Sequence, residues 1–188
     1  MTELEKEPEI EVENVVASAS LEHGIDLKAV VKALPVVEYR PDVFPGLVYR
    51  TKRPRTANLV FRTGKMVCTG AKSEKEARRA VMKVVKELKK SGIIIIGKPE
   101  IKVVNMVASA NLSGRIELED CAYSLGRTMY EPEQFPGLIY RMDEPKVVIL
   151  LFASGKLVCT GATKEEDVYK AVGKLHKKLE EKELIYYE

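Results

Sequence analysis

An internal duplication constrains the fold of this chain more than any other feature. Residues 10–88 align without a gap on residues 101–179, and about 35 of the 79 aligned positions are identical. The agreement is closest between RPDVFPGLVYRTKRPRTANLVFRTGKMVCTGA at 40–71 and EPEQFPGLIYRMDEPKVVILLFASGKLVCTGA at 131–162. Two copies are too few for a solenoid, which needs at least three stacked repeats. We therefore predict one pseudo-two-fold unit whose halves present the same surface, and we expect the function on that surface.

Composition sets broad limits on the class of protein. A chain of 188 residues, 45% of them hydrophobic, can bury a substantial core. The longest apolar runs, Ile93–Ile96 and Val147–Phe152, are far too short to span a bilayer. The acidic N-terminus lacks the basic and then apolar order of a secretory signal. We therefore expect a cytoplasmic protein without a targeting signal.

The cysteines and histidines predict neither a disulfide framework nor a metal site. Cys68, Cys121 and Cys159 show no CxxC spacing, and the first and last occupy the same position in the two copies. This usage suits small buried residues in a reducing compartment. The two histidines are not repeated, and no Cys-His or Ser-His arrangement is evident. We predict a protein that is not an enzyme, with no catalytic residue, no metal ligand and no cofactor.

The net charge of +3 conceals a strong asymmetry along the chain. Residues 3–13 contain six glutamates against one lysine, whereas residues 40–90 contain 15 basic and 4 acidic residues, an excess of 11. Such a stretch favours a polyanionic partner. Helical spacing also fits a purely solvated helix face for Lys83, Lys86, Lys89 and Lys90.

Periodicity predicts the same elements in the same order in both halves. In the first half we predict a strand at 9–20, a helix at 26–34 capped by Asp26, four short apolar runs forming an antiparallel meander over 36–69, and a helix from Ser73 to about Lys90. In the second half we predict a strand at 101–112, a helix near 117–125, strands up to 160 and a helix at 164–181. The expected organisation is an acidic arm at 1–8, a first repeat at 9–98, a second repeat at 99–180 and a tail at 181–188.

Both faces of the predicted sheet are apolar. With a side-chain period of two, Leu59 and Phe61 share one face of their strand, and Val60 points to the other. Leu150 and Phe152 repeat the pattern in the second half. Two helices per repeat can cover only one face of an antiparallel sheet, so the second face needs a partner. On periodicity alone, a second copy of the chain or a second sheet would also serve.

Four motifs recur in the two halves: NxVAS at Asn14 and Asn105, FPGLxYR at Phe44 and Phe135, PR or PK before an apolar strand, and GKxVCTGA ending at Ala71 and Ala162. Through these motifs the chain resembles an archaeal-type TATA-box-binding protein over essentially all of 9–179. The resemblance implies an α+β fold, a pseudo-two-fold saddle made of a curved antiparallel β-sheet with two repeats of about five strands and four helices on the convex face. It also implies a nucleoid-associated general transcription factor that binds the minor groove of the TATA box, bends promoter DNA and nucleates the preinitiation complex with transcription factor B and RNA polymerase.

The resemblance assigns roles to repeated residues. The insertion of apolar wedges between base steps is an established property of this family, and the wedges fall on the chain's four phenylalanines, Phe44, Phe61, Phe135 and Phe152. Minor-groove edges of A·T pairs present only acceptors, and contacts to them are assigned to Asn14, Asn105, Thr69, Thr160, Val16, Val107, Leu59, Leu150, Val67 and Val158. Phosphate contacts are assigned to Arg50, Arg55, Lys65, Lys72, Arg141, Lys146 and Lys156. Thr163 stands where Lys72 predicts a lysine, so we expect the second half to hold phosphate less tightly.

The two copies differ in charge around their FPGL turns. Glu131 and Glu133 stand where the first half has Arg40 and Asp42. Acidic side chains beside DNA suit a basic protein partner, and the resemblance assigns the docking of transcription factor B to this loop. The main alternative function is a TATA-binding-like fold used as a protein-interaction or accessory domain without sequence-specific DNA binding. A homodimeric structural protein is a third alternative.

Overall fold

The computed structural model describes residues 7–188, so most of the predicted acidic arm at 1–8 lies outside the described residues. The chain divides into two compact units. The first unit is formed by residues 14–104, and the second by residues 105–188 together with residues 7–13. Each unit contains an antiparallel sheet and two helices, in the order that the duplication predicts.

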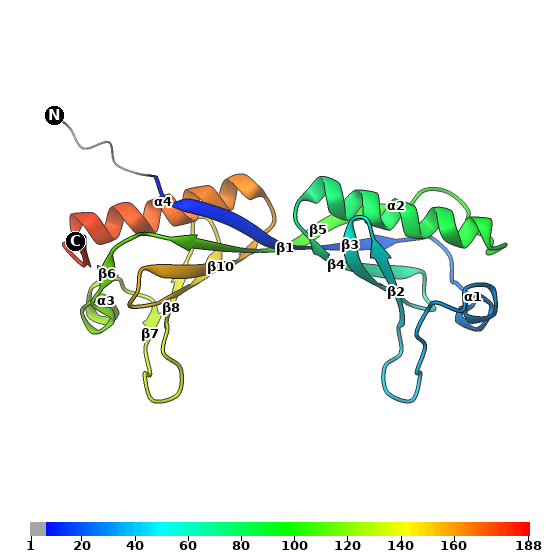
Figure 1. Cartoon of the computed structure of the whole chain (residues 1–188), viewed down its shortest axis with the longest axis horizontal. Helices are drawn as coiled ribbons and strands as arrows, with labels where there is room; N and C mark the ends of the chain where they lie inside the picture. The colour runs from blue at the N-terminus through cyan, green and yellow to red at the C-terminus, as the bar shows by residue number, and fades with distance from the viewer. Residues whose placement is uncertain (1–6) are drawn as a thin grey trace. The chain divides into compact units, whose positions relative to one another are not determined.

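The first unit has a four-stranded sheet in the order β2-β3-β4-β1. Helix α2 lies across one face of this sheet, and the loop at 40–46 projects from the opposite side (Figure 1). The elements are β1 (Glu9–Ser20), α1 (Leu27–Ala33), β2 (Leu47–Lys52), β3 (Arg55–Val60), β4 (Lys65–Ala71) and α2 (Glu74–Lys90). Of the four apolar runs predicted over 36–69, three are strands. The run at 36–39, flanked by Pro35 and Pro41, forms only an isolated bridge between Glu38 and Val48.

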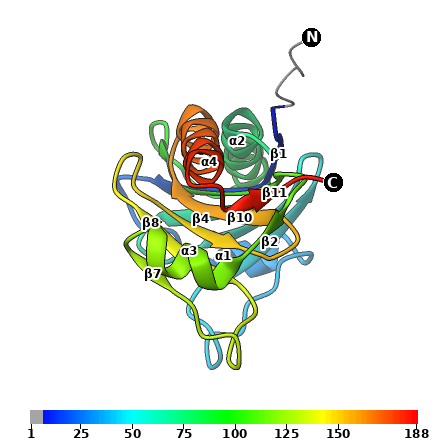
Figure 2. The ribbon, with the colours of Figure 1, turned by 90° about the vertical axis from the view of Figure 1, so that its left-hand side faces the viewer.

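The second unit repeats this arrangement, with the strand order β5-β10-β9-β8-β7. Figure 2 views it from its end, with α4 above β10. The elements are β5 (Glu100–Asn111), β6 (Arg115–Ile116), α3 (Leu118–Ser124), β7 (Thr128–Met129), β8 (Leu138–Met142), β9 (Val147–Leu151), β10 (Lys156–Ala162), α4 (Glu165–Glu181) and β11 (Ile185–Tyr186). The short strands β6 and β11 pair with each other in a separate two-stranded sheet.

Local sequence explains where the helices begin. Asp26 caps α1 by accepting hydrogen bonds from the backbone N–H groups of Lys28 and Ala29. At α2, Ser73 Oγ accepts a hydrogen bond from the N–H of Glu76 at 3.1 Å, as in a capping box, while the Glu76 carboxylate accepts from Lys72 N–H. Helix α4 has no side-chain cap, and three acidic residues in its first turn interact favourably with the helix dipole instead.

The core of each unit lies between its sheet and its long helix. In β3 and β4 every second side chain is buried, including Val60, Met66 and Cys68, while Leu59 and Val67 on the other face remain half-buried. The same alternation runs through β9 and β10. Both faces are therefore apolar, as predicted, and the long helix covers one of them. No helix among residues 7–188 is long and apolar enough to cross a membrane.

Candidate nucleic-acid interface

The face of each sheet opposite the long helix forms a continuous apolar surface, which we call the open face. Cross-strand pairs place side chains of neighbouring strands next to one another on this face. In the first unit its half-buried members are Val16, Val48, Leu59 and Val67. In the second unit they are Val107, Ile139, Leu150 and Val158. Sequence reasoning missed Val48 and Ile139. Successive side chains along a strand point to opposite faces, so in β2 and β8 the residue before Tyr49 and the residue before Tyr140 could have been assigned to the open face.

Two phenylalanines meet at the end of each open face. The rings of Phe44 and Phe61 lie 5.9 Å apart at 69°, and those of Phe135 and Phe152 lie 5.9 Å apart at 68°. This edge-to-face geometry is favourable for aromatic pairs. Phe44 and Phe135 each remain 39% exposed, which is unusual for so apolar a side chain. The structure therefore brings the four predicted wedge residues together as two equivalent pairs.

The glycine of the FPG motif makes room for each pair. A Cβ atom at Gly46 would lie 2.7 Å from the ring of Phe44 and 2.9 Å from that of Phe61. At Gly137 the corresponding distances, to Phe135 and Phe152, are 2.8 and 3.0 Å. Real Cβ atoms do not make such short contacts. The motif is therefore retained in both copies because it seats the aromatic pair.

A tight turn fixes the backbone after each second phenylalanine. Phe61 N–H donates to Lys65 O at 2.9 Å, and Gly64 N–H donates to Phe61 O at 3.0 Å. Gly64 has φ +92, and a Cβ there would lie 2.1 Å from the carbonyl oxygen of His23. The turn from Phe152 to Lys156 carries the same hydrogen bonds, both at 3.0 Å. Glycine is thus required where the turn approaches the neighbouring backbone.

A β-bulge positions the repeated asparagines. Gly70 and Gly161 adopt φ +98 and +104, and the strand register shifts at both places. The freed Gly70 N–H donates to Asn14 Oδ1 at 2.7 Å, which fixes the orientation of that side-chain amide. Asn14 Nδ2 then donates one hydrogen to Thr69 Oγ1 at 3.1 Å. Among the described residues its second hydrogen has no acceptor, so it can donate to one outside the protein.

The second unit repeats this arrangement. Asn105 Oδ1 accepts from Gly161 N–H at 2.7 Å, and Asn105 Nδ2 donates to Thr160 Oγ1 at 3.2 Å. The structure therefore brings both predicted Asn-Thr pairs into contact. The sequence indicated that these residues repeat, but the glycine N–H that orients each amide was missed, since only a bulge turns that N–H toward the side chain.

Basic side chains flank the first open face. Arg50, Arg55 and Lys65 lie on the strand positions that alternate with the buried ones, and all three are exposed. Arg50 forms an ion pair with Glu38 at 2.8 Å, but both side chains are more than 60% exposed. Such a pair is worth little and can be exchanged for a phosphate. Lys72 is exposed where β4 meets α2.

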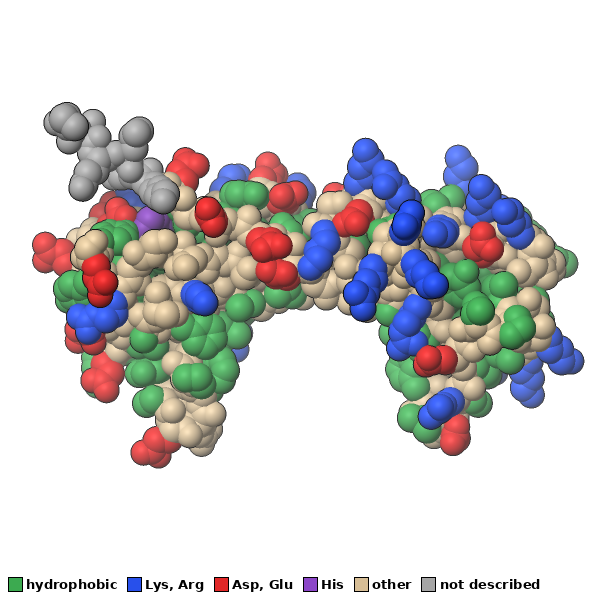
Figure 3. Space-filling view, viewed as in Figure 1, with side chains coloured by type: hydrophobic (Ala, Val, Ile, Leu, Met, Phe, Trp, Pro, Cys, Tyr) green, Lys and Arg blue, Asp and Glu red, His purple; other side chains and the backbone are tan. Residues whose placement is uncertain are grey.

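Three of the predicted phosphate ligands belong to the second unit, where Arg141, Lys146 and Lys156 are exposed. Thr163 is exposed at the position equivalent to Lys72. In Figure 3 the basic side chains gather over the unit that carries α2, and acidic side chains are more frequent over the unit that carries α4. The charge asymmetry of the sequence is thus displayed on the surface.

The loops that carry Phe44 and Phe135 share a backbone but differ in charge. Arg40 O accepts hydrogen bonds from Val43 N–H and Phe44 N–H at 3.0 and 2.9 Å. Glu131 O accepts from Gln134 N–H and Phe135 N–H, both at 3.0 Å. Both Glu131 and Glu133 are exposed. The second loop therefore presents two carboxylates where the first presents Arg40 and Asp42, one side chain of each charge.

The described residues offer little chemistry for catalysis. Burial raises the pKa of the Cys159 thiol to about 11. Burial, together with nearby Asp120, raises the pKa of Cys121 to about 11, and burial also raises the pKa of Cys68. These thiols are therefore protonated at neutral pH and poor nucleophiles. Within residues 7–188, no group of three His, Cys, Asp or Glu side chains is placed to hold a metal ion.

Comparisons with known proteins agree with this geometry. The family model described as "Transcription factor TFIID (or TATA-binding protein, TBP)" matches residues 9–91 and again 100–182. The chain is 52% identical over 177 residues to the TATA-box-binding protein of Pyrodictium occultum, covering 94% of this chain and 89% of that protein. It is 51% identical over 176 residues to that of Sulfolobus acidocaldarius, with the same coverage.

A solved structure described as Methanococcus jannaschii TBP matches with a TM-score of 0.84 at 51% identity, covering 93% of this chain and 99% of that one. The predicted α+β class, with two repeats, antiparallel strands and four helices, is confirmed. The resemblance that the repeated motifs indicated is confirmed as well. This chain belongs to the TATA-binding protein family.

Proposed function

We propose that this protein is a general transcription factor that binds the A·T-rich TATA box through the minor groove and bends the promoter DNA. The observation that carries the proposal is the twofold occurrence of one constellation. Each unit combines an apolar open face, an oriented asparagine donor and an exposed pair of phenylalanines. The relatives that match over most of this chain are described as TATA-box-binding proteins. The repeats at 9–98 and 99–180 would act together on one DNA site.

The constellation suits the minor groove of A·T pairs. That groove presents only acceptors at A·T pairs, whereas a G·C pair adds the guanine amino group. The free Nδ2 hydrogens of Asn14 and Asn105 can donate to such acceptors, and the open faces can pack against the groove. A guanine amino group would meet these donors and apolar side chains unfavourably. Selectivity for A·T pairs then follows from both shape and hydrogen bonding.

The phenylalanine pairs supply the wedges for bending. Partial unstacking of a base step costs a few kcal/mol, which inserted apolar rings and the additional contact area of bent DNA can offset. The edge-to-face packing within each pair stiffens the wedge before DNA arrives. A ring that is already partly exposed in the free protein loses little buried contact when it moves into the DNA. The two pairs would therefore kink the duplex at two steps.

A binding measurement tests the proposal. Fluorescence anisotropy should show tight binding to a TATA-containing duplex and much weaker binding to a duplex with G·C substitutions in the same positions. The Asn105→Asp variant keeps the acceptor for Gly161 N–H but replaces the donor by a negative charge. We expect at least a tenfold loss of affinity with an unchanged fold. Ser124→Asp adds the same charge on α3 and serves as the control. Equal affinity of the wild-type protein for both duplexes would refute the proposal and favour the accessory-domain alternative.

We further propose that the acidic loop at Glu131 and Glu133 docks a basic surface of transcription factor B, which then brings RNA polymerase into the complex. Carboxylates beside DNA are repelled by its phosphates, so they suit a positively charged protein partner.

Replacing both glutamates by arginine should leave DNA binding intact or slightly tighter, and should abolish the ternary complex with the factor. The repeat-matched control is Arg40→Glu. A normal ternary complex with the double variant, in a gel shift at moderate salt, would remove this role. Such a protein would work in the cytoplasm at the nucleoid.

A further inference from the structure

The C-terminal tail corresponds to the segment that follows the long helix of the first repeat. Residues 182–188 align with 91–97 at the constant offset of the duplication. Both segments leave their helix in the same way, since Leu184 N–H donates to Leu179 O at 2.8 Å and Ile93 N–H donates to Leu88 O at 3.0 Å. Beyond this point the two segments differ in structure.

In the second unit the segment forms a strand. Ile185 pairs with Ile116, Tyr186 pairs with Arg115, and Ile185 is only 8% exposed. The arginine guanidinium lies over the Tyr186 ring, 5.5 Å from its centroid. Gly114 makes this packing possible, because a Cβ there would lie 2.6 Å from Ile185 Cγ1. The segment is thus fitted against β6.

In the first unit the equivalent segment forms no strand. The residue equivalent to Gly114 is His23, whose Nε2 accepts a hydrogen bond from Ile96 N–H at 2.9 Å. No strand ladder is present over 93–97. Ile94 and Ile96, the counterparts of Ile185 and Tyr187, are 79% and 72% exposed. Among the described residues, this segment therefore lacks the strand pairing that holds its counterpart in the second unit.

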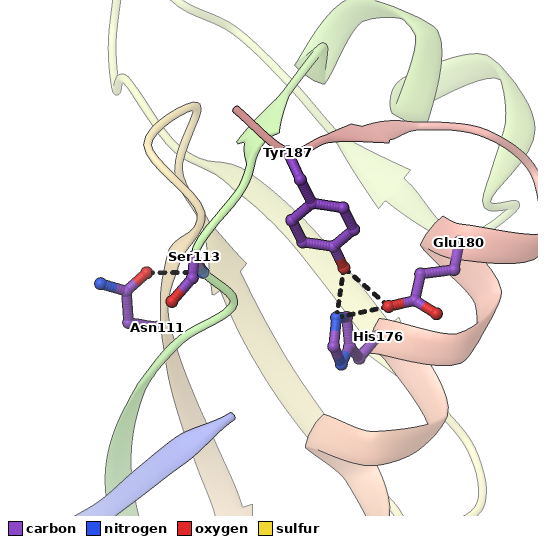
Figure 4. Close-up of polar contacts among 5 residues, drawn as sticks. All are labelled: Asn111, Ser113, His176, Glu180 and Tyr187. Atoms are coloured by element: carbon purple, nitrogen blue, oxygen red, sulfur yellow. Dashed lines mark hydrogen bonds and ion pairs between the residues drawn. The ribbon is translucent and has the colours of Figure 1, made fainter. Parts of the chain in front are cut away.

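An anchor on α4 secures the segment in the second unit (Figure 4). Tyr187 Oη lies 2.7 Å from His176 Nε2 and donates to Glu180 Oε1 at 2.6 Å, while His176 and Glu180 are themselves 2.9 Å apart. The His176 and Tyr187 rings also meet edge-to-face at 6.5 Å. The first repeat has Val85 and Lys89 at the positions of His176 and Glu180. The anchor is therefore specific to one copy.

Strand β6 and the residues just before it also contact the turn that carries Phe152. Ile116 N–H donates to Ala153 O at 2.9 Å, and Leu112 N–H donates to Gly155 O at 2.8 Å. Asn111 Oδ1 accepts from Ser113 N–H at 2.9 Å and shapes the chain between these two bonds (Figure 4). Contacts therefore run from Tyr187 through β11 and β6 to the Phe152 turn.

The first unit has the same bonds to its wedge turn, but among the described residues no paired strand lies behind them, and His23 Nε2 accepts a hydrogen bond from Ile96 N–H there instead. Ile25 N–H donates to Arg62 O at 2.9 Å, and Leu21 N–H donates to Gly64 O at 3.1 Å. The pairing of β11 with β6 is therefore a difference between the two copies on this side of the sheet.

We infer that residues 184–187 act as a brace that stiffens the Phe152 wedge relative to the Phe61 wedge. Tyr187, His176 and Glu180 are positioning residues in this arrangement, because they act through β6 and touch neither ring. If the protein binds DNA as proposed, the two ends of the DNA site are kinked by wedges of unequal stiffness. This consequence rests on the proposed function. Two halves with the same arrangement of strands and long helix would thereby differ in stiffness at their wedges.

Hydrogen exchange on the free protein tests the brace without DNA. In the wild type, amides of the Phe152 turn and of Ile116 should exchange more slowly than those of the Phe61 turn and of Ile25. Tyr187→Phe removes the hydroxyl and keeps the ring, and it should speed exchange at the Phe152 turn by roughly five- to tenfold. Ile185→Ala should do the same more strongly. Ile94→Ala, at the exposed equivalent position, is the control and should change neither turn. Equal exchange at the two turns of the wild type would overturn the inference.

A double-mutant cycle on DNA tests the consequence, and it does not depend on the orientation in which the protein binds. Tyr187→Phe should weaken binding to the TATA duplex by roughly threefold to tenfold. The same change should have less than a twofold effect in a Phe152→Ala background and its full effect in a Phe61→Ala background. Equal effects in both backgrounds would refute a brace for one wedge. Absence of selective DNA binding by the wild type would refute the proposed function, while the exchange measurement would still decide whether the brace exists.

Discussion

Replacing the FPG glycine by alanine should disable one wedge pair without unfolding the protein. A Cβ at Gly46 would lie 2.7 Å from the Phe44 ring, whereas ordinary contacts begin at 3.4 Å, so the ring must retreat by about 0.7 Å. The Phe61 ring, at 2.9 Å, must retreat as well. Neither Gly46 nor Gly137 has a positive φ, so alanine introduces no backbone strain of its own. The substitution therefore acts on ring placement.

The size of the effect follows from overpacking. Forcing extra atoms into a filled site costs about 1–3 kcal/mol. Because Phe44 is 39% exposed, its ring can move outward in the free protein, and most of the cost should fall on the DNA complex, which requires the seated pair. That range corresponds to about 5-fold to 150-fold weaker binding at 25 °C. The Gly137→Ala variant should behave alike, because its contacts to Phe135 and Phe152 are 2.8 and 3.0 Å.

Fluorescence transfer between dyes at the two ends of the duplex measures the bend. Each single variant, at saturating protein, should straighten the DNA partly, and the double variant should straighten it more. Gly173→Ala is the control, because no atom lies within 4 Å of its added Cβ in α4. It should raise stability by about 0.5–1 kcal/mol and leave the bend unchanged. Wild-type affinity and end-to-end distance for both wedge variants would show that the glycines do not seat the wedges.

Three further predictions concern salt dependence and stability. With seven candidate phosphate ligands, the slope of log K against log salt should be no steeper than roughly −6. Lys65→Ala should reduce the magnitude of this slope by about one unit, and an unchanged slope would remove Lys65 from the interface. Asn58 is fully buried and its Oδ1 has no partner among the described residues, whereas Ile149 holds the equivalent position. Asn58→Val should therefore raise the free energy of unfolding in urea by about 1 kcal/mol, and a lower value would contradict this. Glu183 has φ +54 where the first repeat has Gly92 at +89, so Glu183→Gly should raise the melting temperature, with a gain of about 0.5 kcal/mol; a lower melting temperature would argue against backbone strain.

The duplication explains why so much of this structure could be predicted from the sequence. The strand at Glu9–Ser20 and the Asp26 cap follow from local patterns, and each pattern found in one copy could be checked against the other. The wedge pairs were indicated because all four phenylalanines repeat, yet the edge-to-face geometry depends on loop packing at Gly46 and Gly137 that no periodicity reveals. The orientation of the asparagine amides was equally hidden, because it depends on a bulge.

Other features were missed because they occur in only one of the two copies. Strands β6 and β11 have two residues each, too short for any periodic signal, and their pairing depends on the absence of a side chain at Gly114. The buried polar cluster of Thr51, Thr56 and Asn58 was also missed. It occupies strand positions where alternation predicts apolar residues, as in the second repeat. Hydrogen bonds within the β2–β3 hairpin join Thr51 to Thr56 and Asn58 Nδ2 to Thr56 and to Tyr49 O, and periodicity does not reveal them.

The bulge glycines have a consequence for how quickly and selectively such a surface can read DNA. An asparagine side chain free in solution samples several rotamers, and holding one of them on binding costs on the order of 1 kcal/mol. The N–H groups of Gly70 and Gly161 already donate to the Oδ1 atoms of Asn14 and Asn105 at 2.7 Å. The entropy loss of ordering these side chains therefore occurs during folding and not during recognition. The two amides need no change of rotamer when the protein reaches a site. A wrong base pair also cannot be accommodated by a flip that exchanges the amide's donor and acceptor. Two rigid, identical donors also read a base sequence and its reverse complement alike, so any preference for direction must come from the parts of the chain in which the two copies have diverged.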